Sequence, residues 1–176
     1  YQPSGCLSRE TLLESGLPLP EFEAVQGSAL VSAAYQGTSF ELSNIRLSDP
    51  AKGAEPVFQG YCLRCRLGFP LPAELSAEAS EDALELLPDA AAEALRRLSE
   101  LLGGGHVSFP AEDTVCLCVA SERELLAPDR RVTDVAVLRR RFAEEMGTVT
   151  QLIDTLLTLR PDAPGTASAD TQALSE

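Results

Sequence analysis

Residues 114–120, TVCLCVA, are the segment of this 176-residue chain that most strongly indicates its fold. Successive side chains of a strand point to opposite sides, and the segment from Val115 to Val119 is apolar on both of them. Such a strand has to be covered on both faces. Residues 106–109 precede it across the turn-forming PAED of residues 110–113, so the two segments predict a β-hairpin.

A second hairpin and a third strand are predicted upstream. Residues 28–35 and 38–47 flank a Gln36-Gly37 turn, and residues 57–69 alternate between apolar side chains and side chains such as Arg64 and Arg66. The alternation predicts that the third strand has one face in water.

The second of these strands changes parity along its length. Phe40 and Leu42 lie on one side, whereas Ile45 and Leu47 lie on the other. A change of parity without a turn indicates one extra residue, so we expect a β-bulge near residues 43–44.

Helices are predicted at both ends and in the middle of the chain. Ser8 caps residues 9–14, which Gly16 ends. Residues 73–102 are rich in Ala, Glu and Leu, but Pro88 divides them into two helices or kinks one, and residues 103–105, three glycines, end the segment. Residues 133–134 cap a last helix that reaches about residue 159.

The last helix carries a heptad pattern. Val135, Phe142, Val149 and Leu156 recur every seven residues, and Glu145 interrupts a second series formed by Leu138, Leu152 and Leu159. This pattern is typical of packing against a sheet, and it also allows a helix–helix contact with a partner.

These elements predict an α+β fold in which an antiparallel five-stranded sheet packs against helices in the order α-β-β-β-α-β-β-α. We expect residues 1–160 to form a single domain and residues 161–176, which lack apolar periodicity, to form a disordered acidic tail.

Charge and cysteine content restrict the function. The formal net charge is -13, from 14 Lys and Arg against 27 Asp and Glu, which argues against nucleic acid and membranes as partners. Five cysteines is an odd number, and their placement in apolar runs favours buried thiols and a reducing compartment. The chain begins at Tyr1 without a Met or a leader, so we expect it to be trimmed or processed.

The sequence carries only weak signals for a catalytic or metal-binding site. Cys62, Cys65, Cys116 and Cys118 have the residue types of a zinc or thiol site, but Cys62 and Cys65 lie three apart on a predicted strand and so face opposite ways. His106, the only histidine, has no accompanying nucleophile motif, and the acidic run between residues 74 and 85 is typical of a solvated helix face. We therefore expect no enzyme activity, no metal and no cofactor.

The element order resembles that of class I type III secretion chaperones and their structural relatives, the YbjN-like proteins. The segments that carry the resemblance are Leu12-Leu13 with residues 16–19, the hairpin that ends at Leu47, residues 61–69 running into 70–72, and the pair 106–109 and 115–126. The chain departs from this pattern in the long loop 48–56 and at Pro88.

The resemblance implies a non-catalytic, cytoplasmic homodimer that holds a protein partner in an extended or partly unfolded form. For partner binding we predict Leu12, Leu13, Val31, Phe40 and Leu42. For the dimer interface we predict Leu95, Leu98, Leu102, Val115 and Leu117.

Two alternatives remain open. One is a zinc- or thiol-dependent protein that uses Cys62, Cys65, Cys116 and Cys118. The other is a regulatory dimer whose last helix pairs with a partner helix through Val135, Phe142, Val149 and Leu156.

Overall fold

A computed structural model describes residues 1–71, 75, 89–126 and 134–160. In these ranges five strands form one antiparallel sheet in the order β1-β2-β3-β5-β4, accompanied by three α-helices. The strands are β1 (Ala24–Tyr35), β2 (Thr38–Ser48), β3 (Phe58–Arg66), β4 (His106–Ala111) and β5 (Thr114–Ala120); the helices are α1 (Arg9–Leu13), α4 (Asp89–Leu102), α5 (Val135–Leu157) and a 3-10 turn, η1 (Pro50–Lys52). The predicted α+β class and element order are confirmed.

The helix boundaries follow local chemistry. The Ser8 hydroxyl accepts a hydrogen bond from the Thr11 N–H, and the Asp134 carboxylate accepts one from Ala136. Gly103, at φ +57°, ends α4 in the left-handed conformation that favours glycine. The predicted helical piece before Pro88 and the predicted tail at 161–176 lie outside the described residues. Within the described ranges, no helix has the length and apolarity needed to cross a membrane.

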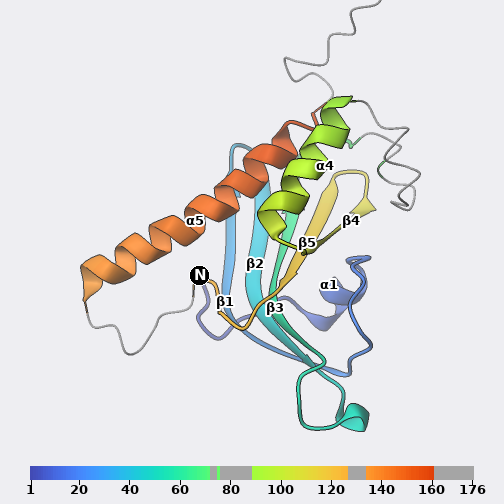
Figure 1. Ribbon diagram of the computed structural model, residues 1–176, viewed down its shortest axis with the longest axis vertical. Coiled ribbons are helices and arrows are strands. Elements are labelled where there is room, and N and C mark those ends of the chain that lie inside the picture. Colours follow the sequence, from blue (N-terminus) through green and yellow to red (C-terminus); the bar gives the residue numbers. More distant parts are fainter. Residues whose placement is uncertain (72–74, 76–88, 127–133, 161–176) are drawn as a thin grey trace, which may run out of the picture.

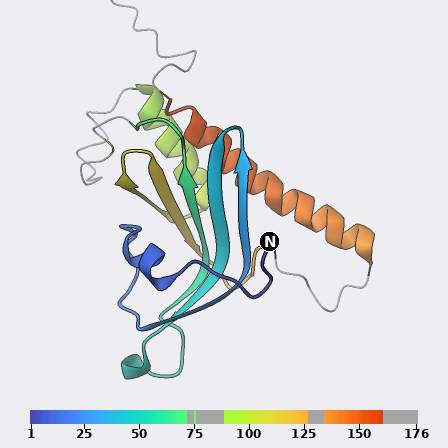
Figure 2. The same ribbon diagram turned by 180° about the vertical axis from the view of Figure 1, so that it is seen from behind.

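The sheet is covered on both faces. Helices α4 and α5 lie across one face, and the N-terminal segment with α1 crosses the other (Figures 1 and 2). Beneath the helices, Leu117 packs with Leu98 and Ile153; beneath the N-terminal segment, Cys118 packs with Leu12. Neighbouring residues of β5 therefore enter different cores, and the prediction of a strand covered on both sides is confirmed.

The predicted bulge at residues 43–44 is wrong in its placement. β2 pairs with β3 in unbroken register, and the register shift lies on the partner strand β1, between Ser28 and Val31. Ala29 has φ +57° there. The parity change in β2 has another cause: Phe40 and Leu42 enter the core under the helices, whereas Ile45 and Leu47 enter the core under the N-terminal segment.

The predicted wet face of the third strand is present at one end only. Arg66 is exposed and Arg64 is half-buried, but Cys62 on the same face is buried under the N-terminal segment. The alternation of side chains did not reveal this cover, because it is supplied by a segment remote in sequence.

Two glycines should respond in opposite ways to alanine. A Cβ at Gly60 would fall on the Val119 carbonyl oxygen, so Gly60→Ala should destabilise the protein by about 1–3 kcal/mol. A Cβ at Gly147, within α5, would meet nothing within 4 Å, so Gly147→Ala should stabilise it by up to about 1 kcal/mol. Urea denaturation of both variants measures the two effects. Equal stability of both would contradict the close packing of the Gly60 backbone against the Val119 carbonyl.

Candidate functional site

The residues predicted to bind a partner do not form one surface. Val31, Phe40 and Leu42 are buried under the helices, and Leu12 is buried on the opposite face of the sheet. Leu13 alone of this group is exposed, at 55%. The physical reason is that alternate strand positions fill the two cores, so the predicted groove is absent from the described part of the chain.

The residues predicted to form a dimer interface do lie together, but inside one molecule. Leu98 and Leu102 of α4 pack in the same core as Val115 and Leu117 of β5, all of them buried. Leu95 is half-buried and packs against this core. Their apolar spacing reflects the packing of α4 on the sheet.

The heptad pattern of α5 divides into two halves. Val149 and Leu156 are buried in the core, whereas Val135 and Phe142 are 58% and 48% exposed. Figures 1 and 2 show why: the C-terminal half of α5 lies over the sheet and its N-terminal half projects past β1. The predicted four-residue contact with a partner helix is therefore wrong for Val149 and Leu156, because the sheet already covers them.

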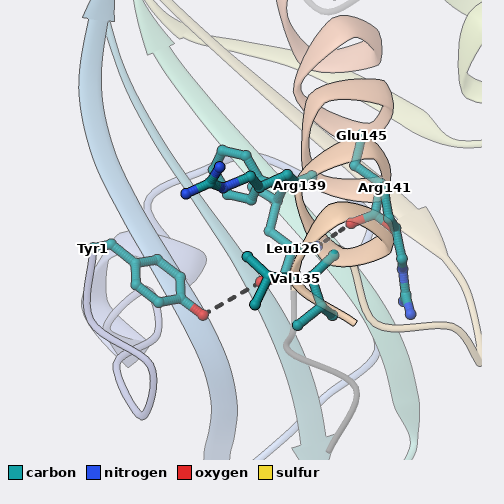
Figure 3. Close-up of a pocket in the computed structure, with 8 residues that line it drawn as sticks. Tyr1, Leu126, Val135, Arg139, Arg141 and Glu145 are labelled. Atoms are coloured by element: carbon teal, nitrogen blue, oxygen red, sulfur yellow. Dashed lines mark hydrogen bonds and ion pairs between the residues drawn. The ribbon is translucent and has the colours of Figure 1, made fainter. Parts of the chain in front are cut away.

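The projecting half of α5 borders an apolar groove of about 340 Å³ (Figure 3). We call it the α5 groove. Three of the most exposed large apolar side chains of the described chain, Tyr1, Val135 and Phe142, line it. The remaining lining residues are Leu126, Leu138, Arg139, Arg141 and Glu145.

Leu126 is fixed at the floor of the α5 groove by polar contacts. Its N–H donates to Glu145 Oε2 at 2.7 Å, and its carbonyl accepts from the Tyr1 hydroxyl at 3.3 Å. Leu126 has φ +54°, a conformation that costs a non-glycine residue about 1–2 kcal/mol. The hydrogen bonds hold this strained residue in place, with its side chain 5% exposed.

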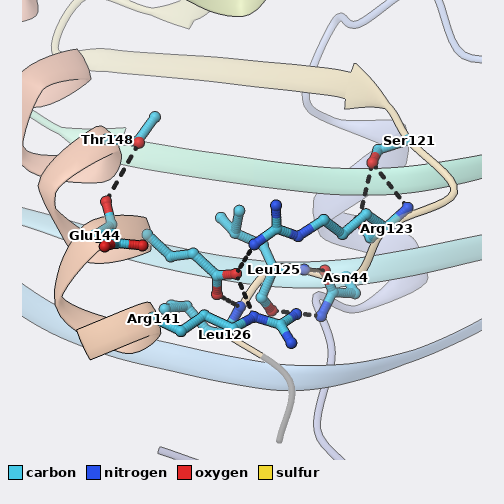
Figure 4. A network of polar contacts seen from close by, with 9 residues as sticks. Asn44, Ser121, Arg123, Leu125, Leu126, Arg141, Glu144 and Thr148 are labelled. Carbon is cyan, nitrogen blue, oxygen red and sulfur yellow. Dashed lines mark hydrogen bonds and ion pairs between the residues drawn. The ribbon is translucent and has the colours of Figure 1, made fainter. Parts of the chain in front are cut away.

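A buried amide from β2 fixes the preceding residue. Asn44 Nδ2 donates to the Leu125 carbonyl at 2.8 Å, and Asn44 Oδ1 accepts from the Leu125 N–H at 2.7 Å (Figure 4). The side chain of Asn44 therefore makes the pair of bonds that a neighbouring strand would make. It joins the segment after β5 to the centre of the sheet.

Glu145 completes the network from α5. Its Oε1 accepts from Arg123 at 2.7 Å and from Arg141 at 2.9 Å, while its Oε2 holds Leu126 (Figure 4). The carboxylate is 7% exposed. Burial acts to raise its pKa, but the hydrogen bonds from Arg141, Leu126 and Arg123 together outweigh it, so the pKa of Glu145 lies below the usual 4.5.

The sequence contained a signal for this network. Glu145 interrupts an apolar heptad series, and a charged residue at a position expected to be buried is paired or hydrogen-bonded when it is buried. Asn44 gave no comparable signal, because the polar pair Ser43-Asn44 between apolar residues indicates a β-bulge.

Glu145→Gln should destabilise the protein by about 1.5–3 kcal/mol at pH 7, since charged hydrogen bonds are replaced by weaker ones. Because the folded pKa is depressed, the stabilisation is complete above 4.5 and is lost as the pH falls through the lower folded value. The difference between wild type and variant in urea denaturation should thus shrink below pH 4.5. Glu144→Gln, at an exposed neighbour, is the matched control, and a pH-independent difference would refute the assignment.

The cysteines form a second cluster, within the sheet. Cys62 and Cys118 are directly opposite each other on β3 and β5, and both are 1% exposed. The Cys62 thiol donates to Cys118, which raises the pKa of Cys62 well above 9.0 and lowers that of Cys118. Burial raises the pKa of Cys65 to about 12 and that of Cys116 to about 11.

The four sheet cysteines are not one ligand set. Cys65 packs under the helices, while Cys62 and Cys118 pack under the N-terminal segment, as the spacing predicted. Across the described ranges there is no group of three or more His, Cys, Asp or Glu side chains placed to hold a metal ion. His106 is exposed, and the acidic run between residues 74 and 85 lies outside those ranges, Leu75 excepted.

The thiols should react in two classes. Cys6 is half-buried, and the four others are buried. At pH 8 we expect one thiol per chain to react readily with an aromatic disulfide reagent in the native protein and five in denaturant, because neutral buried thiols are poor nucleophiles. If a second thiol of the native protein also reacts rapidly, and Cys118→Ser removes that reaction, the result would favour a thiol-dependent protein instead.

Comparison of the chain with family models, curated proteins and solved structures finds no match in any of the three. What the described residues define is an α+β protein with an apolar groove beside a projecting helix.

Proposed function

We propose that this chain is a non-catalytic protein-binding module, similar in role to the secretion chaperones and YbjN-like proteins that its element order resembles, and that it binds its partner at the α5 groove. The observation that carries the proposal is the gathering of exposed apolar side chains, with Val135 58% and Phe142 48% exposed on the projecting half of α5. Contiguous apolar surface of this kind marks interaction sites.

The groove is also built to keep its shape. Leu126 is held through its N–H by Glu145 and through its carbonyl by Tyr1, and Asn44 fixes the residue before it. A preformed site loses less conformational entropy when a partner binds, because its side chains and backbone are already ordered. This supports a binding role for the groove.

The acidic residue of the groove also helps to keep the groove in shape. Among the described residues Glu145 is the one acidic side chain that lines the groove, and both of its carboxylate oxygens accept hydrogen bonds from the chain itself. We assign Glu145 to positioning Leu126. The five free thiols suit a reducing compartment, so we propose that the protein works in the cytoplasm.

Phe142→Ser should remove partner binding while leaving the fold intact. An aromatic anchor at an interface is worth about 2 kcal/mol or more, which is a loss of affinity of roughly thirtyfold. The ring is 48% exposed, so the free energy of unfolding should change by less than about 1 kcal/mol. Parallel affinity purifications of wild type and variant from the native cells, compared by quantitative mass spectrometry, identify the proteins that are lost.

Leu13→Ser is the matched control, because Leu13 is 55% exposed on α1, at the opposite face of the sheet. The proposal predicts at least one protein that wild type and the Leu13 variant both retain and the Phe142 variant loses. Identical protein sets for all three, with all three folded by circular dichroism, would refute it.

A further inference from the structure

The occupant of the α5 groove can be specified by charge; this inference depends on the function proposed above. We infer that the groove takes an amphipathic segment of a partner protein whose apolar side chains are flanked by Asp or Glu. The inference is drawn from Arg139 at the rim, an exposed cation in a chain whose formal net charge is -13.

The rim of the groove carries an available cation. Of the residues that the structure describes, two arginines and one glutamate line the groove, and Glu145 is already neutralised by Arg141 and by Arg123 from outside the lining. Arg139 is exposed and forms no ion pair with any residue in the described part of the chain. In Figure 3 its side chain extends toward Tyr1, away from Arg141.

The position of Arg139 suits recognition of a carboxylate. A guanidinium presents a planar fork of N–H donors that matches a carboxylate with two parallel hydrogen bonds. Arg139 itself lines the groove beside Leu138 and Phe142, so a ligand that inserts apolar side chains there brings its flanking residues near the guanidinium. Removal of water from this contact by the apolar lining strengthens it.

The apolar spacing indicates a helical partner face. Val135, Leu138 and Phe142 follow at i, i+3 and i+7 along α5, the spacing by which one helix packs beside another. The matching partner segment has apolar residues at the same spacing, with carboxylates at the positions beside them.

A second copy of the chain is a poorer occupant. A two-fold interface places the same patch on both subunits, so two α5 helices joined through this groove would bring residues 139–141, three arginines, close to their own copies. Like charges across an interface disfavour association. A basic segment meets the same repulsion at Arg139.

Three synthetic amphipathic peptides test the inference. They share leucines at i, i+3 and i+7 and differ in carrying Glu, Gln or Lys at the flanking positions. Fluorescence anisotropy with the full chain should rank their affinities Glu, then Gln, then Lys, and added salt should weaken the Glu peptide more than the Gln peptide.

Variants of the rim localise the effect. Arg139→Glu should weaken the Glu peptide roughly five- to tenfold and strengthen the Lys peptide, whereas Phe142→Ser should weaken all three. Arg140→Glu is the matched control, since it makes the same change of charge at an exposed neighbour that does not line the groove. An equal response to Arg139→Glu and Arg140→Glu would mean a general field effect and overturn the inference.

The remaining outcomes separate this inference from the proposed function. Equal binding of the three peptides, lost on Phe142→Ser, overturns the acidic preference and leaves the groove a protein-binding site. Concentration-dependent dimerisation in sedimentation that Phe142→Ser abolishes identifies a second copy as occupant and also overturns it. Failure of all three peptides overturns it too, while the purification comparison still decides the proposed function.

Discussion

The central strands of the sheet are apolar on both faces and therefore need a cover on each side. Leu117 and Cys118 are neighbours on β5, yet one packs under α4 and α5 and the other under the N-terminal segment. No single helix layer can bury both. The chain therefore uses its C-terminal helices for one face and its first residues, with α1, for the other.

The α5 groove follows from the way this problem is solved. α5 is longer than the part of the sheet it covers, so its first turns project and leave Val135 and Phe142 exposed. The segment after β5 is tied to the sheet by Asn44 and to α5 by Glu145, which places Leu126 beside those side chains. The apolar lining is thus positioned by buried polar groups, each with its hydrogen-bond partners satisfied.

Sequence reasoning succeeded where the signal was local. Caps such as Ser8 and Asp134, the Gln36-Gly37 turn and the glycines after α4 act within a few residues, and their predicted places are confirmed. The position of the bulge was predicted wrongly. A change in the side on which apolar residues of β2 lie has the same sequence pattern whether one residue is inserted or the two ends of the strand are buried in different cores. Sequence reasoning also failed for the groove residues, because a buried Phe40 and an exposed Phe142 are equally apolar in sequence.

From the sequence alone one could predict the α+β class, the order of the elements, the N-caps of α1 and α5, the glycine that ends α4, and the division of Cys62 and Cys65 between opposite faces of β3. Those properties are set by backbone geometry and by side-chain period along a few residues. Three further properties became visible only in the folded chain: which half of α5 is buried, which strand carries the bulge, and that Tyr1, Leu126 and Phe142 share one groove. These depend on the relative lengths of sheet and helix and on contacts between residues more than a hundred positions apart, such as Tyr1 with Leu126, which no local pattern encodes.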